Sequence, residues 1–161
     1  MANPIYTKFE TPITFKDSGG SAVIALQNLA FGVGRISARY DRGTGSIATW
    51  YMCRVTIQLE TAGTTGEVVE IYVSSSDGTN PDGEIGTADA ALTSDKRRNL
   101  KQVGFVITDQ TAATTNMTAS FPVWVPTRYF SVGVWNGTTD NLENTANACL
   151  ISFTPIPDEI Q

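Results

Sequence analysis

The sequence predicts an all-β protein, folded as an antiparallel sandwich of two sheets, and two patterns support this expectation. Most of the chain consists of short segments in which apolar and polar residues alternate, which is typical of strands with one solvated face. Gly, Asn and Asp residues of the kind that form turns separate these segments, and no segment has the apolar spacing of an amphipathic helix. Two sheets packed face to face would bury so many half-apolar strands. We expect a jelly-roll-like sandwich, because the Cys–Trp–Cys pattern of immunoglobulin domains is missing.

Residues 48–60 form the clearest strand, and we expect this strand at the centre of the domain. The apolar side carries Tyr51, Cys53, Val55, Ile57 and Leu59, and the solvated side carries Met52, Arg54, Thr56, Gln58 and Glu60. Residues 61–66 are rich in Gly and Thr, which predicts a turn. Residues 67–74 are then expected to return as the hairpin partner of this strand.

Shorter strands are expected on both sides of this pair. They cover residues 13–16, 21–27, 35–42, 100–108, 115–125, 128–135 and 148–154. Residues 75–100 form one long irregular loop, in which a single helical turn fits near residues 88–92, and loops of this length are usually functional. The expected organisation is an extended N-terminal arm (residues 1–12), one sandwich domain (13–155) and a short C-terminal tail (156–161).

Length and composition limit the classes of function. A chain of 161 residues suffices for one domain with its own core. The net charge of −5 argues against electrostatic binding of nucleic acid, and the sequence has no apolar stretch long enough to cross a bilayer. The first residues lack the basic and apolar regions of a signal peptide, so we expect a protein made and used without Sec export.

The sequence contains no histidine, which removes most catalytic arrangements. Ser-His-Asp and Cys-His catalysis, histidine bases and most zinc sites all need that side chain. The acidic residues lie in expected turns or on the solvated sides of strands, where they need no catalytic role. We therefore expect no enzyme activity, no catalytic residue and no cofactor.

Two further groups of residues have ordinary structural explanations beside functional ones. Asp77, Asn80 and Asp82 offer hard oxygen ligands for a cation, but the closing Glu of an EF-hand is missing and turns alone explain these residues. Cys53 and Cys149 lie in apolar strand patterns, where free cysteines are usually buried. We interpret both as buried thiols, with a disulfide between adjacent strands as the alternative.

Partner contacts are expected at three places. Ile5, Tyr6 and Phe9 make the N-terminal arm suitable for docking on a neighbouring subunit, because large apolar side chains are poorly placed in solvent. The alternative is a frayed terminus. Lys96, Arg97 and Arg98 form the only basic run, which is either a contact for an acidic surface or simply solvated. Trp135 precedes an Asn-Gly turn, so among the tryptophans it is the best candidate for exposure and for stacking on a glycan.

Several stretches of the sequence resemble small virion proteins of tailed bacteriophages, in particular head decoration (cement) and related capsid-surface proteins. They are SAVIALQNLA (21–30), GRISARYDRG (34–43), EIYVSSSDGTNPDG (70–83), GTADAAL (86–92) and FTPIPDEIQ (153–161). The resemblance extends from about Phe15 to Gln161 and rests on overall pattern, without a motif that singles out contact residues.

This resemblance implies a β-sandwich that binds the phage major capsid protein on the outside of the shell, often as a homotrimer at junctions between capsomers. Such a protein is present in the host cytoplasm during assembly and on the virion surface afterwards. It stabilises the shell mechanically, by burying surface across capsomer boundaries. The alternative is a glycan- or receptor-binding virion module, associated with a head fibre or the tail, that uses aromatic residues such as Trp135.

Overall fold

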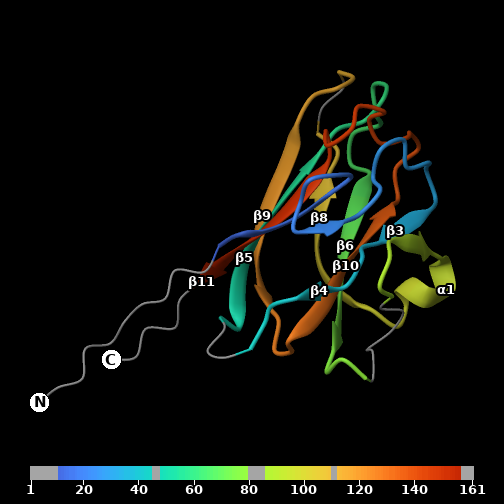
Figure 1. The fold of residues 1–161 in the computed structure, drawn as a ribbon. Coiled ribbons are helices and arrows are strands. Elements are labelled where there is room, and N and C mark those ends of the chain that lie inside the picture. Colours follow the sequence, from blue (N-terminus) through green and yellow to red (C-terminus); the bar gives the residue numbers. More distant parts are fainter. Residues whose placement is uncertain (1–10, 45–47, 80–85, 110–111, 157–161) are drawn as a thin grey trace, which may run out of the picture.

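Two antiparallel-rich sheets pack face to face in the computed structural model, which describes residues 11–44, 48–79, 86–109 and 112–156 (Figure 1). Sheet A contains, in spatial order, β2 (Ala22–Val23), β1 (Ile13–Lys16), β11 (Leu150–Ile156), β5 (Trp50–Ile57) and β9 (Met117–Trp124). Sheet B contains β7 (Ala90–Leu92), β3 (Gly34–Ile36), β10 (Tyr129–Asn136), β6 (Val68–Ser76) and β8 (Lys101–Ile107), with β4 (Tyr40–Asp41) also pairing with β10. One short helix, α1 (Ser94–Arg97), lies between β7 and β8. The predicted all-β sandwich is confirmed.

The main strands pair as a series of nested antiparallel hairpins. The innermost pair is β6 with β8, followed outwards by β5 with β9, β3 with β10, and β1 with β11. The first and third of these pairs belong to sheet B, and the other two belong to sheet A. Nested pairs that alternate between two sheets constitute a jelly roll, so the expected topology is also present.

The hairpin predicted between residues 48–60 and residues 67–74 is wrong. β5 pairs with β11 and β9 in sheet A, whereas β6 pairs with β10 and β8 in sheet B. Ten residues separate the end of β5 at Ile57 from the start of β6 at Val68. Tight hairpins use two to five residues, so this longer connection allows the chain to cross from one sheet to the other.

The expected helical turn near residues 88–92 is also wrong. Residues 90–92 form β7, which pairs with β3 at the edge of sheet B. The helix begins two residues later, because the Thr93 hydroxyl accepts a hydrogen bond from the Lys96 amide at 3.3 Å and caps the helix N-terminus. Two predicted strands are shorter than expected, since 21–27 contains only β2, and 35–42 is interrupted between β3 and β4.

An aromatic cluster fills the space between the two sheets. Rings from both sheets meet edge to face, with centroids 5.3–6.3 Å apart. Its members are Phe15, Tyr40, Tyr51, Phe130 and Phe153. Aliphatic side chains surround the cluster and complete a single core between the sheets.

Both cysteines are free and buried in this core, as predicted, and they form no disulfide. Burial raises the pKa of the Cys53 thiol to about 12 and that of the Cys149 thiol to about 11, because the charged thiolate is poorly solvated there. We expect Ellman's reagent at pH 8 to leave both thiols unreacted in the native protein and to titrate both in denaturant, because the thiolate is the reactive form. Rapid reaction of either native thiol would contradict this burial.

A smaller apolar cluster covers part of the outer face of sheet B. Its buried members are Ile36, Tyr72, Leu92 and Leu100, and Trp135 packs against them. Residues 92–100 carry α1, and we call them the α1 segment. Leu92 and Leu100 lie at its two ends, so the α1 segment covers the outer side of β3, β10 and β6. The long loop therefore has a packing role over its second half.

Gly34 is expected to be essential for the close approach of β3 to β10. A Cβ atom at this position would lie 2.6 Å from the carbonyl oxygen of Val134 and 3.2 Å from the Cβ of Leu92. We expect Gly34→Ala to lower the free energy of unfolding by about 1–3 kcal/mol, because overpacking forces the backbone to shift. Gly86→Ala is the control, since its nearest contact would be 3.4 Å. Equal stability of the two variants in urea unfolding would contradict this expectation.

Candidate functional site

The outer face of sheet A carries an exposed apolar surface, which we call the tryptophan face. It consists of Trp50, Met52, Pro122, Trp124 and Ile156. Trp50 lies directly between Ile156 on β11 and Trp124 on β9, and Met52 lies opposite Pro122. Side chains at such cross-strand positions are about 5 Å apart at Cβ, so the five residues form one continuous surface.

Strand alternation explains why these residues face outward. In β5 the odd-numbered residues from Tyr51 to Ile57 are buried in the core, so Trp50 and Met52 point to the opposite face. In β9 the same alternation buries Val123 and exposes Trp124. Trp50 and Trp124 are each 45% exposed, a large apolar area for side chains that are usually buried.

The tryptophan face has a polar rim that carries positive charge. Arg54 is exposed on the same face of β5, one cross-strand row further along the sheet. The Lys101 ammonium lies 5.5 Å from the ring centroid of Trp124. An apolar centre with a polar rim is the usual composition of a protein interaction surface.

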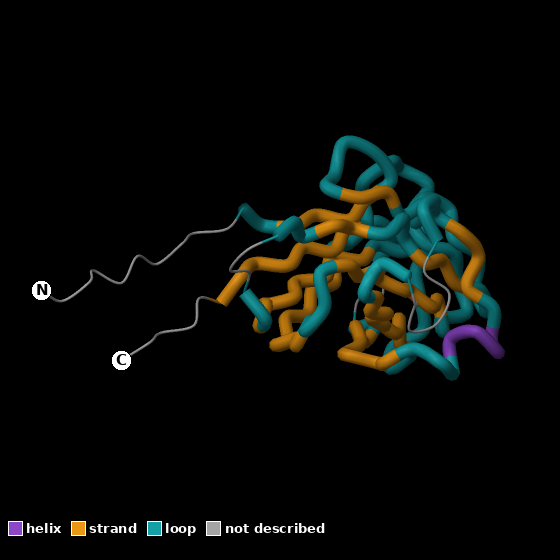
Figure 2. Tube along the Cα trace, turned by 60° about the horizontal axis from the view of Figure 1, so that its bottom comes forward, coloured by secondary structure: helices purple, strands orange, loops and turns teal. Residues whose placement is uncertain are grey.

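The first and the last described segments of the chain lie at the same end of the molecule (Figure 2).

The basic run is divided between two environments. The Arg97 guanidinium donates to the Glu70 carboxylate at 2.7 Å and lies 4.2 Å from the ring centroid of Trp135. Arg98 is different, because its side chain is 76% exposed and its ion pair with Asp95 is long, at 3.6 Å. Arg97 therefore fastens the α1 segment to sheet B, and Arg98 is the residue of this run that is open to a partner.

Trp135 is not the most exposed tryptophan, contrary to the expectation from its position. It is half-buried, because the apolar cluster of sheet B packs against it and the Arg97 guanidinium lies over its ring. Trp50 and Trp124 are the exposed pair, which the sequence interpretation missed. Extending the alternation of residues 51–60 back by one residue would have placed Trp50 on the solvated side.

The remaining predicted site residues are only partly described. Ile5, Tyr6, Phe9, Asn80 and Asp82 lie outside the described residues. Asp77 accepts a hydrogen bond from the Thr79 amide at 2.7 Å, which is the turn that explains an Asp there.

Residues 11–44, 48–79, 86–109 and 112–156 contain no group of three His, Cys, Asp or Glu side chains placed to hold a metal ion. The same ranges contain no helix long and apolar enough to cross a membrane.

Comparison with protein-family models gives no match to this chain, and comparison with curated protein sequences gives no significant match either.

Proposed function

We propose that this protein is a structural virion protein that binds the outer surface of a tailed-phage capsid and stabilises the shell across capsomer junctions. The tryptophan face is the attachment surface in this proposal, and it is the single observation on which the proposal rests. Contiguous exposed apolar patches on a soluble domain mark interaction surfaces. Tryptophan is also the residue type most enriched among the side chains that dominate binding energy.

Three features support a mechanical role over a catalytic one. The sequence has no histidine, and its charged fraction is only 17%. A jelly roll holds the tryptophan face on paired strands, which present a rigid surface to a partner. The sequence also resembles capsid-surface proteins of tailed phages over most of its length. Together these features fit a protein whose contribution is buried area between shell subunits.

The test is co-sedimentation of the purified protein with expanded phage shells from which it has been removed. We expect the wild-type chain to bind and to raise the melting temperature of the shells. The double variant Trp50→Ser, Trp124→Ser should bind at least about 100-fold more weakly, because two tryptophan contacts of about 2 kcal/mol each are lost. Phe31→Ser is the matched control, since Phe31 is another exposed aromatic residue, 60% exposed, outside the tryptophan face.

Two outcomes would contradict the proposal in different ways. Absence of wild-type binding to shells would reject the decoration function itself. Equal binding by the double variant and the wild type would leave decoration in place but reject the tryptophan face as the attachment surface. Circular dichroism and unfolding curves of the variants would confirm that each one is folded.

A glycan-binding virion module is the second candidate, and the adjacent pair Trp50 and Trp124 favours it. Two exposed indole rings at neighbouring positions on a sheet resemble a stacking platform for sugar rings. Titration with soluble glycans would then change tryptophan fluorescence in the wild type but not in the double variant. Shell binding that is insensitive to the same glycans would favour decoration.

A further inference from the structure

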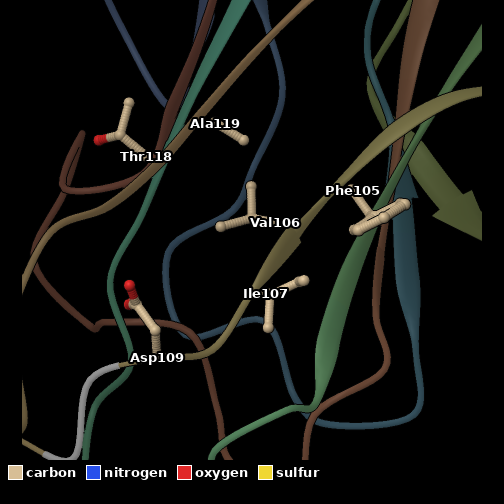
Figure 3. Close-up of a pocket in the computed structure, with 6 residues that line it drawn as sticks. All are labelled: Phe105, Val106, Ile107, Asp109, Thr118 and Ala119. Carbon is tan, nitrogen blue, oxygen red and sulfur yellow. The ribbon is translucent and has the colours of Figure 1, made fainter.

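A second surface lies where the edges of the two sheets meet, on the side formed by β8 and β9. Each of these strands pairs with only one other strand in the part of the chain that the structure describes. The two edges come close at Gly104, where an added Cβ would lie 2.4 Å from the ring of Phe121. Beyond this contact lies a cavity of about 420 Å³, lined by Phe105, Val106, Ile107, Asp109, Thr118 and Ala119 (Figure 3).

The lining shows that this cavity runs along the edge of β8. Successive side chains of a strand point to opposite faces, so three consecutive residues line one cavity only where it follows the backbone. Figure 3 shows residues 105–107 on one strand and Thr118 and Ala119 on the other. An edge strand presents unpaired N–H and C=O groups, to which an extended segment adds by main-chain hydrogen bonds.

Large apolar side chains and one carboxylate characterise the same edge. Phe105 and Ile107 are each 50% exposed, although both are large and apolar. They belong to the outer face of sheet B, where the α1 segment covers β3, β10 and β6 but leaves this part of β8 open. Asp109 is the only charged residue in the lining. An extended, apolar segment with one positive charge would complement this surface.

The cavity along the edge of β8 is a groove, and we propose that this groove binds residues 1–9 of a second copy of the chain. This segment contains the large apolar residues Ile5, Tyr6 and Phe9, and its only charged side chain is Lys8. Lys8 is complementary to Asp109 in the groove. The tryptophan face is a poorer site for the same segment, because Arg54 and Lys101 make its rim positive.

The direction of β1 makes a neighbouring copy the donor of this segment. β1 pairs with β11 so that Ile13 lies opposite Phe153, and the chain before it starts towards the end of the sheet that holds Trp50 and Trp124. The groove lies beside Thr118, about 10 Å along β9 from the level of Ile13 and three strand spacings, about 14 Å, across the sheet. Lys8 precedes Ile13 by five residues, which extend at most about 18 Å. For Lys8 to reach Asp109 within one copy, the segment would therefore have to reverse its direction and be almost fully extended.

Exchange of this kind uses two different surfaces and is therefore heterologous. Each copy donates residues 1–9 and receives the same segment from another copy. Heterologous contacts generate rings when the rotation between copies closes. A closed ring of three copies is consistent with the trimer that the resemblance implies. The inference itself is independent of the proposed function, because it concerns association of the protein with itself.

Analytical ultracentrifugation of the isolated protein tests this proposal directly. We expect the full-length chain to form a discrete oligomer. The chain lacking residues 2–10 and the double variant Phe105→Ser, Ile107→Ser should both be folded monomers. The double variant Trp50→Ser, Trp124→Ser should remain an oligomer, because the tryptophan face takes no part in this contact. A monomeric full-length chain, or an oligomer that survives both the deletion and the groove substitutions, would overturn the proposal.

A charge exchange tests the orientation of the segment without removing apolar contacts. A fluorescent peptide of residues 1–12 should bind to the chain that lacks residues 2–10. The Lys8→Glu peptide should bind about threefold to tenfold more weakly, and Asp109→Lys in the protein should restore its binding. Binding that is lost in the Trp50→Ser, Trp124→Ser protein instead would place the segment on the tryptophan face and overturn the proposal. Failure of shell binding affects none of these results, so the two proposals fail separately.

Discussion

Replacement of Phe130 by alanine is expected to lower the free energy of unfolding by about 3–5 kcal/mol. Phe130 is fully buried on β10 of sheet B. Its ring lies 5.4 Å from that of Phe15 and 5.3 Å from that of Phe153, measured between centroids, and both of these residues belong to sheet A. The substitution removes the ring that joins the two layers and leaves a cavity that rigid sheets cannot fill.

The measurement is urea unfolding followed by thermal unfolding, with Phe31→Ala as the control. Phe31 is 60% exposed, so its loss should change the free energy of unfolding by no more than about 0.5 kcal/mol. For a domain of this size, the Phe130→Ala loss corresponds to a fall in melting temperature of roughly 6–20 °C. A loss of less than about 1 kcal/mol would mean that the sheets are held together by the surrounding aliphatic residues rather than by this cluster.

The fold class could be predicted because alternation is a local property of the sequence. Residues 13–16 form β1 as expected, and the predicted apolar side of residues 51–57 is the buried side of β5. The partners of each strand could not be predicted in this way, because pairing depends on residues far apart in the chain. β5 pairs with residues 117–124 and 150–156, and nothing in its own sequence distinguishes these partners from β6, the next strand along the chain.

The continuity of the tryptophan face could not be predicted for the same reason. Trp50, Trp124 and Ile156 are adjacent only through the register of three strands. The error over Trp135 has a related cause, because Arg97 and the cluster around Leu92 and Leu100 cover it from another part of the chain. Sequence patterns indicate which side of a strand a residue occupies. They do not indicate what covers that side.

Replacement of Asn136 by alanine is the second substitution with a large expected effect, about 2–4 kcal/mol of stability. Asn136 is fully buried at the end of β10. Its Nδ2 donates to the carbonyl oxygens of Leu29 at 3.1 Å and Asp140 at 2.8 Å, and its Oδ1 accepts from the Thr138 amide and hydroxyl. Alanine would remove the acceptor of the buried Thr138 amide and one of the two donors to each of the Leu29 and Asp140 carbonyl oxygens. An unpaired buried polar group costs about 1–3 kcal/mol.

Hydrogen exchange distinguishes this loss from a general weakening of the core. The Asn136 side chain holds two loops together, and the Leu142 amide, which donates to the Leu29 carbonyl at 3.0 Å, reports on their contact. We expect Asn136→Ala to reduce protection at Leu142 more than at amides in the middle of β5. Asn144→Ala is the control, because Asn144 is exposed on the same connection between β10 and β11. If both variants reduced protection equally across the two sheets, Asn136 would act through global stability and not as the link between these loops.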